Sequence, residues 1–295
     1  MDIEKHLSKL HPATVKILDK SKEERIRYLY EDKWIGYPKA KEILTELNRL
    51  YNMPHKLRMP NLLIYGETNN GKSSIIDHFK KQHPNEDGEE VEIIPIVSVM
   101  APEGPDLNAL YDAILYEMMV PFASTAKKSK KLHQIQYYFE LTNVRMLVVD
   151  EIHNILSGTV GKQKEFMNAL KNLNNTLHIP IVLVGIKDAL RATSTDAQIK
   201  NRFPPIHLPQ WSYDSKDYLQ LLASIEKLLP LKKPSSLANN RELALEIYTK
   251  TDGYIGEIFT YITMVAEQVI QSGREYISLK DLQSSSYERD DSLVS

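Results

Sequence analysis

A glycine-containing loop is the part of the sequence whose residue types and spacing point most directly to chemistry. Residues 66–73 read GETNNGKS and match the phosphate-loop pattern G-x-x-x-x-G-K-[ST] in full. The apolar run LLIYG leads into the loop and the helical pattern SIIDHFKK follows it, which is the strand–loop–helix context that the motif requires. Backbone amides of such a loop cradle phosphate oxygens at a helix N-terminus. We therefore expect the loop to bind the phosphates of a nucleotide.

Side chains of this loop have separate expected roles. Lys72 is expected to reach the β- and γ-phosphates, and the Ser73 hydroxyl is expected to ligate Mg²⁺. The expected cofactors are therefore ATP and Mg²⁺. The residues predicted to bind the nucleotide are Gly66, Glu67, Thr68, Asn69, Asn70, Gly71, Lys72, Ser73 and Ser74.

A second motif places two carboxylates at the end of another apolar run, RMLVVDEIH, which covers residues 145–153. Asp150 is predicted to join Ser73 in holding the Mg²⁺ shell, and Glu151 is predicted to orient and polarise the attacking water. His153 is expected to begin a helix or to pack, because no other histidine stands at metal-ligand spacing. The two motifs together predict a P-loop ATPase in which Lys72 and Glu151 act in catalysis.

The elements that must position these residues alternate along the chain. Short continuous apolar strands separated by helices indicate a parallel sheet with helices on both faces. The expected strands cover residues 62–66, 91–99, 145–150 and 179–185, with a weaker fifth at 205–209. The expected helices between them cover residues 74–81, 107–119 and 164–177. Pro95 predicts that the second strand lies near an edge or is bulged.

The character of the sequence changes after Trp211, where three helical patterns follow one another with no strand between them. The predicted organisation is an N-terminal helical segment (1–55), an α/β nucleotide-binding core (56–211), a small helical lid (212–283) and a flexible polar tail (284–295). The fold class is therefore α/β, with a five-stranded parallel sheet sandwiched by helices and followed by the lid.

Composition narrows the class of protein. The chain has 295 residues, of which 42% are hydrophobic and 26% charged, as in ordinary globular proteins. It has no cysteine, which excludes disulfides, cysteine zinc sites and thiol nucleophiles. A net charge of −2 excludes a cationic field over the whole surface, so any nucleic-acid contact needs a local patch. No apolar segment predicts a secretory signal or a membrane span, and we expect a cytoplasmic protein without a membrane partner.

The order of motifs resembles the AAA+ superfamily, and within it the initiator-like ATPases. At finer grain, the segments PNLLIYGETNNGKSSIIDHF, RMLVVDEIHNIL, IPIVLVGIKDALRATSTDAQIKNRFPPIHLPQW and TDGYIGEIFTYITMVAEQVI resemble the TniB/TnsC family of transposition ATPases, over about residues 35–282. This family serves Tn-family elements, including CRISPR-associated transposons. The resemblance implies a bacterial ATPase that forms homo-oligomers, as a ring or helical filament, on double-stranded DNA without sequence specificity. It also implies recruitment of a DDE transposase and a TniQ-type adaptor.

The resemblance also assigns residues outside the two motifs. Arg202 in the tripeptide NRF matches the arginine that the family offers to a neighbouring subunit's nucleotide, where it stabilises charge on the γ-phosphoryl group. Two positions depart from the wider superfamily. Ile186 stands where a polar residue that senses the γ-phosphate is usual, although Lys187 could substitute for it, and Glu257 stands where some relatives carry an arginine. Both departures predict slow or partner-stimulated hydrolysis.

The basic segment STAKKSKK contains the DNA contacts that the resemblance implies, namely Lys127, Lys128, Lys130 and Lys131. A solvated loop with no ligand is an equally good interpretation of such a run. Arg191 is expected to pair locally, with Asp188 or Asp196. Two other functions stay open on sequence grounds: an ATP-dependent scaffold that never touches DNA, and a relative of replication initiators or helicase loaders.

Overall fold

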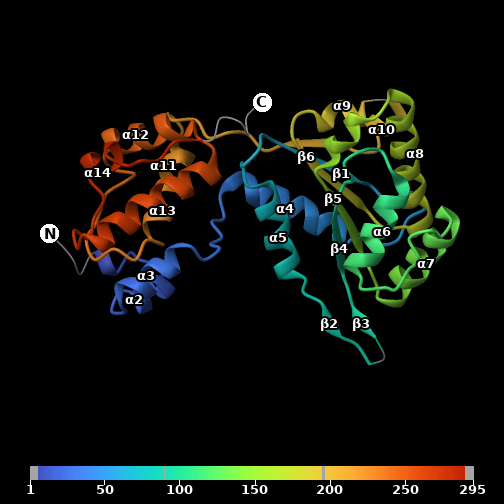
Figure 1. The fold of residues 1–295 in the computed structure, drawn as a ribbon, viewed down its shortest axis with the longest axis horizontal. Helices are drawn as coiled ribbons and strands as arrows, with labels where there is room; N and C mark the ends of the chain where they lie inside the picture. Colours follow the sequence, from blue (N-terminus) through green and yellow to red (C-terminus); the bar gives the residue numbers. More distant parts are fainter. Residues whose placement is uncertain (1–5, 90, 195–196, 290–295) are drawn as a thin grey trace. The chain divides into compact units, whose positions relative to one another are not determined.

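The computed structural model describes residues 6–89, 91–194 and 197–289 (Figure 1). The described residues form two compact units. The first contains the described residues up to Pro38, residues 68–71 and the described residues from Pro209 onward; the second contains the described residues of 39–67 and 72–208. The N-terminal segment that we expected over residues 1–55 is thus distributed between the two units.

A five-stranded sheet organises the second unit. Its strands are β1 (Leu62–Tyr65), β4 (Ile96–Met100), β5 (Met146–Asp150), β6 (Ile181–Gly185) and β7 (Pro205–His207). Their order is β4-β5-β6-β1-β7, and every pairing is parallel. The predicted α/β fold with a parallel five-stranded sheet is therefore confirmed.

Apolar composition explains why the sheet is internal. All five residues of β6 are buried, as are the first four of β5, so helices must cover both faces. Figure 1 shows α4 and α5 on one side of this sheet and α7 and α8 on the other. The helices of this unit are α4 (Pro38–Tyr51), α5 (Lys72–Gln82), α6 (Leu107–Glu117), α7 (Lys128–Leu141), α8 (Val160–Leu177), α9 (Ala189–Thr193) and α10 (Ala197–Lys200), with a 3₁₀ helix η1 (Ile152–Ser157) after β5.

The expected strand over residues 91–99 is divided at Pro95. A two-residue strand β3 (Glu92–Ile93) pairs antiparallel with β2 (Glu86–Asp87), and β4 begins only after the proline. Pro95 has no N–H to offer a neighbouring strand, but its carbonyl accepts from the backbone of Arg145 at 2.9 Å. β4 is an edge strand of the main sheet, as the proline predicted.

The first unit is helical. It contains α2 (Pro12–Ile17), α3 (Lys22–Leu29), α11 (Lys216–Glu226), α12 (Arg241–Thr251), α13 (Ile255–Gln271) and α14 (Leu279–Gln283). The three helices expected after Trp211 correspond to α11, α12 and α13, whereas α2, α3 and α14 are additional. Among the helices of the described residues, none combines the length and apolarity needed to cross a membrane.

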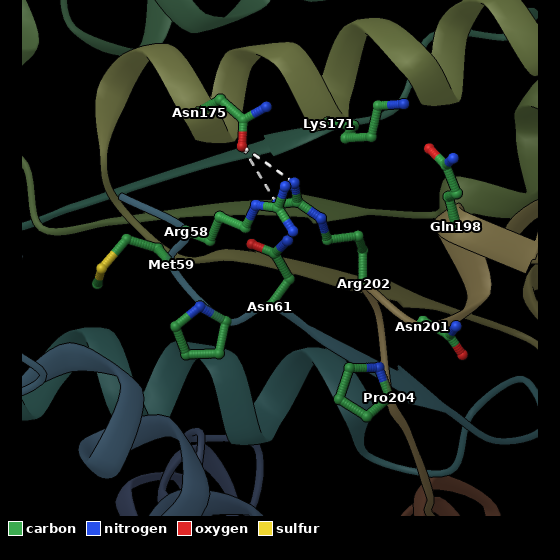
Figure 2. A pocket seen from close by; sticks show the side chains of 10 residues that line it. Arg58, Met59, Asn61, Lys171, Asn175, Gln198, Asn201, Arg202 and Pro204 are labelled. Carbon is green, nitrogen blue, oxygen red and sulfur yellow. Dashed lines mark hydrogen bonds between the residues drawn. The ribbon is translucent and has the colours of Figure 1, made fainter. Parts of the chain in front are cut away.

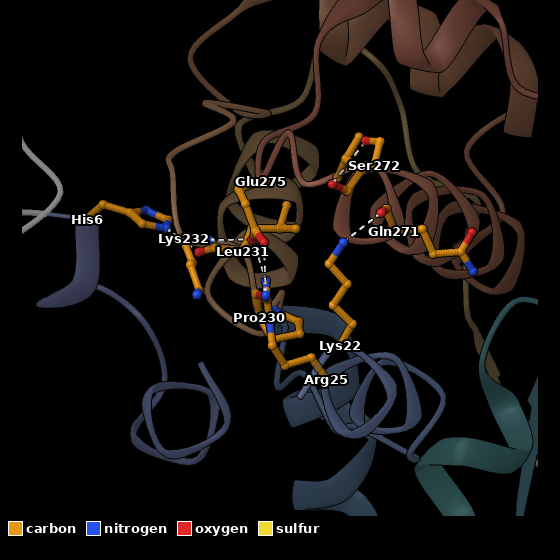
Figure 3. A network of polar contacts seen from close by, with 10 residues as sticks. His6, Lys22, Arg25, Pro230, Leu231, Lys232, Gln271, Ser272 and Glu275 are labelled. Atoms are coloured by element: carbon orange, nitrogen blue, oxygen red, sulfur yellow. Dashed lines mark hydrogen bonds and ion pairs between the residues drawn. The ribbon is translucent and has the colours of Figure 1, made fainter. Parts of the chain in front are cut away.

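A buried ion pair joins the two ends of the chain within this unit (Figure 3). The Arg25 guanidinium, 2% exposed, donates to Glu275 Oε1 at 2.9 Å and to the Pro230 carbonyl at 3.0 Å. Lys22 on the same helix donates to the Gln271 carbonyl at 2.8 Å. Burial alone would raise the pKa of Glu275, but hydrogen bonds and charge from Arg25 outweigh it and hold that pKa below its usual value.

The last described residues also pack in this unit. Tyr287 is 7% exposed and donates a hydrogen bond to Glu257, and Arg289 pairs with Asp252. The start of the tail that we expected to be flexible is therefore in contact with α12 and α13. The final residues of that tail, 290–295, lie outside the described residues.

Candidate functional site

The phosphate loop joins β1 to α5 and has the backbone shape that its glycines permit. Gly71 has a φ of 84°, a conformation that side chains with a Cβ rarely adopt. At Gly66 a Cβ would lie 2.4 Å from the Leu208 carbonyl oxygen, so the close approach of the two segments requires glycine. Asn69 also has a left-handed φ of 55°, which asparagine tolerates better than most residues. The backbone of the loop therefore requires glycine at positions 66 and 71 and favours asparagine at position 69.

Lys72 begins α5 and its side chain folds back over the loop. Its ammonium donates to the carbonyls of Gly66 at 3.0 Å and Glu67 at 2.7 Å. Burial lowers the pKa of Lys72, and the charges of Glu151 and Asp150 oppose that effect. The loop thus holds a buried cation against nearby carboxylates, which suits it to bind phosphate oxygens.

Ser73 and Asp150 meet although 77 residues separate them in sequence. The Ser73 hydroxyl donates to Asp150 Oδ2 at 2.9 Å, and the Glu151 backbone N–H donates to Asp150 Oδ1 at 2.8 Å. Among the described residues, no cluster of three or more acidic, histidine or cysteine side chains could cage a metal alone. A hydroxyl with one carboxylate fits Mg²⁺, which is usually bound by one or two side chains together with substrate phosphates.

Glu151 stands at the start of η1 in a strained conformation. Its φ of 53° and ψ of 36° are left-handed, which is uncommon for a non-glycine residue. Its Oε2 lies 3.2 Å from His153 Nε2, and His153 Nδ1 is buried beside Gly185 without a hydrogen-bond partner. His153 lies in a helix, as expected, but its contact with Glu151 was not predicted. The sequence pattern D-E-x-H places the two residues close together in the chain, but it does not predict that their side chains meet.

The tip of the loop, residues 68–71, belongs to the first unit and contacts α13 of that unit. The Asn69 side chain donates to Glu257 Oε1 at 2.6 Å, and the Gly256 N–H donates to the Asn69 carbonyl at 3.0 Å. A Cβ at Gly256 would lie 1.8 Å from Asn69 Oδ1, so this contact requires glycine. Glu257 thus binds an uncharged amide of the phosphate loop, which is compatible with its negative charge.

Arg202 lies at the opposite edge of the sheet from the phosphate loop. It precedes β7, whose first residue pairs with Leu63, whereas the loop follows β1. Its guanidinium donates to Asn174 Oδ1 at 3.1 Å. It also donates to Asn175 Oδ1 at 3.2 Å (Figure 2). The structure therefore does not bring Arg202 to Lys72 within one subunit. Arg191, by contrast, is 75% exposed and lies 3.7 Å from Asp188, the local pair that we expected.

The basic run STAKKSKK is divided: residues 124–127 form a turn, and α7 begins at Lys128. Lys127 precedes the helix, and Lys127, Lys128 and Lys130 are exposed. Lys131 differs from our expectation of a DNA contact, because its side chain is fully buried. Its ammonium lies 2.6 Å from Asp112 Oδ1 and donates to the Ser124 carbonyl at 2.9 Å. Lys131 therefore anchors the segment that precedes α7, and only the other three lysines can face a ligand.

Comparison with solved structures supports the fold. ORC2 of Aeropyrum pernix, solved in ADPNP–ADP complexes, matches with a TM-score of 0.62 and 18% identity, over 87% of this chain and 70% of that one. Cdc6p of Pyrobaculum aerophilum matches with a TM-score of 0.61 and 15% identity, over 86% and 68%. The A. pernix ORC1 protein in complex with DNA matches with a TM-score of 0.54 and 13% identity, over 88% and 68%. The chain thus shares the α/β P-loop fold of these proteins.

Comparison of the sequence with protein families is more specific. No curated protein matches the chain at a significant level. The family described as "Bacterial TniB protein" matches residues 25–213, which include the phosphate loop, the Asp150–Glu151 pair and Arg202. Because this match covers more than half of the 295 residues, the chain belongs to the TniB family.

Proposed function

We propose that this chain is an ATPase that assembles on double-stranded DNA when ATP is bound and recruits a DDE transposase to the target site. A TniQ-type adaptor is the second proposed partner, and the bacterial cytoplasm is the proposed location. The observation that carries the proposal is the contact of Ser73 with Asp150 next to Lys72, in a member of the TniB family.

The proposed chemistry is phosphoryl transfer to water. Lys72 binds the β- and γ-phosphates, and Ser73 and Asp150 would hold Mg²⁺, which supplies positive charge to the phosphate oxygens. Glu151 orients the attacking water and accepts its proton. Its left-handed backbone, at the end of β5, sets the direction of that carboxylate.

Arg202 acts in trans in this proposal. Its position at the N-terminal edge of β7 leaves it remote from the phosphate loop of its own subunit, which supports a role at a neighbour's nucleotide. A trans arginine makes hydrolysis dependent on assembly, as a ring or a helical filament. We propose that hydrolysis is slow or partner-stimulated, because Ile186 offers no side-chain hydrogen bond and Glu257 binds Asn69 instead of phosphate.

The proposed DNA contacts are Lys127, Lys128 and Lys130, which are exposed at the start of α7. Lysines at this position would bind phosphates of the backbone without choosing a sequence. The fold neighbour ORC1 of A. pernix was solved with DNA, which supports DNA as a ligand for this fold. Binding should then weaken steeply as salt rises.

The test of the proposal is ATP binding and ATP-dependent retention on duplex DNA by wild type, Lys72→Ala and Lys81→Ala chains. Lys81 lies on the same helix, is 62% exposed and pairs with Asp77, so it serves as the matched control. We expect Lys72→Ala to lose nucleotide binding and DNA retention together, and Lys81→Ala to keep both. Equal ATP affinity in the two variants would contradict the assignment of the phosphate loop.

A role in replication initiation or helicase loading is the second candidate, because the fold matches ORC and Cdc6 proteins. Binding assays with purified candidate partners distinguish the transposition function from the replication function. ATP-dependent capture of a DDE transposase supports the first function, whereas capture of a replicative helicase alone supports the second. An ATP-dependent scaffold would form oligomers without DNA.

A further inference from the structure

A pocket of about 750 Å³ opens in the second unit around Arg202 (Figure 2). Arg58, Lys171 and Arg202 all line it, and no carboxylate does. None of the three cations forms an ion pair with a carboxylate among the described residues. Positive charges gathered in this way repel one another, and an anion in the pocket would relieve that repulsion.

A buried amide adds a hydrogen-bond donor that has no acceptor. Asn61 is 1% exposed, and its Oδ1 accepts from the Ile181 N–H at 2.8 Å and from Asn174 Nδ2 at 2.9 Å. The backbone N–H of Ile181 can only donate, so it fixes which end of the Asn61 amide faces the strand. Asn61 Nδ2 is then left buried without a partner. Buried donors are nearly always satisfied, so an acceptor is expected beside this one.

The three cations line the pocket from different segments: Lys171 from α8, Arg58 from the segment before β1 and Arg202 from the turn before β7. Lys171 and Asn175 are four residues apart on α8 and therefore share a face of that helix. Asn175 Oδ1 accepts from both terminal nitrogens of Arg202 at 3.2 Å, which holds the guanidinium over the pocket. A guanidinium has five N–H donors, so the three hydrogen bonds to Asn174 and Asn175 leave two donors for an anion. Figure 2 shows Arg58, Asn61 and Arg202 extending into this space.

We propose that this pocket binds a phosphate group, which Arg58, Lys171 and Arg202 hold by charge and which accepts a hydrogen bond from Asn61 Nδ2. The site is distinct from the phosphate loop, because Asn61 precedes β1 and Gly66 follows it. The group could belong to the nucleotide of a second copy, in which case the inference rests on the proposed trans arrangement. It could also belong to a free phosphorylated small molecule.

Titration with tripolyphosphate tests the pocket itself. The background is Lys72→Ala, which removes the phosphate loop as a competing site, and binding is measured by calorimetry at low ionic strength. We expect Lys171→Gln or Arg58→Gln to weaken binding at least five-fold relative to Lys162→Gln. Lys162 is the matched control, because nine residues at 100° each place it on the opposite face of α8 from Lys171. Affinities within two-fold in all variants would overturn the inference.

A mixing experiment identifies the source of the phosphate. Glu151→Gln chains keep the pocket but lack the proposed water-orienting carboxylate, and Lys171→Gln chains keep that carboxylate but lack a pocket cation. If the phosphate belongs to a neighbour's nucleotide, each variant hydrolyses ATP slowly on DNA and their mixture regains activity. If it belongs to a free molecule, Lys171→Gln alone matches wild type and the mixture gives the average rate.

The two proposals fail separately. A chain that hydrolyses ATP on DNA but shows equal tripolyphosphate affinity in all variants contradicts the pocket and not the function. A chain that loses tripolyphosphate binding in Lys171→Gln but never hydrolyses ATP contradicts the function and not the pocket.

Discussion

Replacing Arg202 by alanine separates an effect on a neighbouring subunit from an effect on the chain's own nucleotide. In the structure the Arg202 guanidinium makes three hydrogen bonds to Asn174 and Asn175. At about 0.5–1.5 kcal/mol each, their loss lowers the free energy of unfolding by about 1.5–4.5 kcal/mol. The fold therefore survives, and the remaining change can be read from nucleotide binding and hydrolysis.

Arg202→Ala should barely change the affinity of the chain for its own ATP, because Arg202 lies far from the phosphate loop. Asn61 lies beside Arg202 at one end of β1, and Gly66 lies at the other, so five residues at 3.3 Å separate them by about 16 Å. Two charges at about 16 Å in water interact by about 0.3 kcal/mol, and physiological salt screens most of that. The dissociation constant of ATP for isolated subunits should change less than about two-fold.

The effect on hydrolysis is large if Arg202 reaches a neighbour. A trans arginine is worth about 10³-fold or more in turnover. The assay pairs titration of a fluorescent ATP analogue, at concentrations where the chain is monomeric, with phosphate release by the DNA-bound assembly. Arg191→Ala is the control, because its exposed pair with Asp188 contributes at most about 1 kcal/mol. A ten-fold loss of ATP affinity in Arg202→Ala monomers would refute the trans assignment.

Four further perturbations test other parts of the account. Glu151→Gln should keep ATP binding but slow hydrolysis about 10²-fold or more, so that ATP-bound assemblies accumulate in sedimentation; unchanged turnover removes Glu151 from its role. Lys131→Met breaks a buried pair with Asp112 and should lower the free energy of unfolding by about 3 kcal/mol. Lys128→Met should instead leave urea unfolding unchanged and reduce the salt dependence of DNA binding; the reverse pattern contradicts both assignments. The pKa of Glu275 is lowered on folding, so its stabilisation is present at pH 7 and is lost as the pH falls through its folded value. Urea unfolding at pH 7 and at a series of pH values below 4.5 should show this loss progressively in wild type and less of it in Glu275→Gln.

The fold was predictable where local pattern decides it. Runs such as LLIY and MLVVD are short, continuous and apolar, and they form the buried strands β1 and β5 as expected. The contact of residues 6–38 with the C-terminal helices was not predictable. It depends on the pairing of Arg25 with Glu275, which lie 250 residues apart and carry no signal in a local window. The prediction that Lys131 contacts DNA was wrong for a related reason. Lysine is almost never fully buried unless it is paired, and the sequence does not show that Asp112 is its partner.

The site was predictable as a set of positions but not of orientations. A phosphate loop after one strand and an acidic pair after another must meet at the same edge of a parallel sheet, and Ser73 does contact Asp150. The backbone of Glu151, its contact with His153 and the contact of Asn69 with Glu257 depend on side-chain directions in irregular segments. The hydrophobic periodicity of the sequence does not predict side-chain directions in such segments.

The central claim is that ATP drives this chain to assemble on DNA. Electron microscopy of the purified chain with duplex DNA, with and without a non-hydrolysable ATP analogue, tests it most directly at low salt. We expect DNA-bound rings or filaments only with the nucleotide, absent in Lys72→Ala and dispersed as salt is raised. An absence of DNA-bound oligomers under these conditions, or their presence without nucleotide, would contradict the claim.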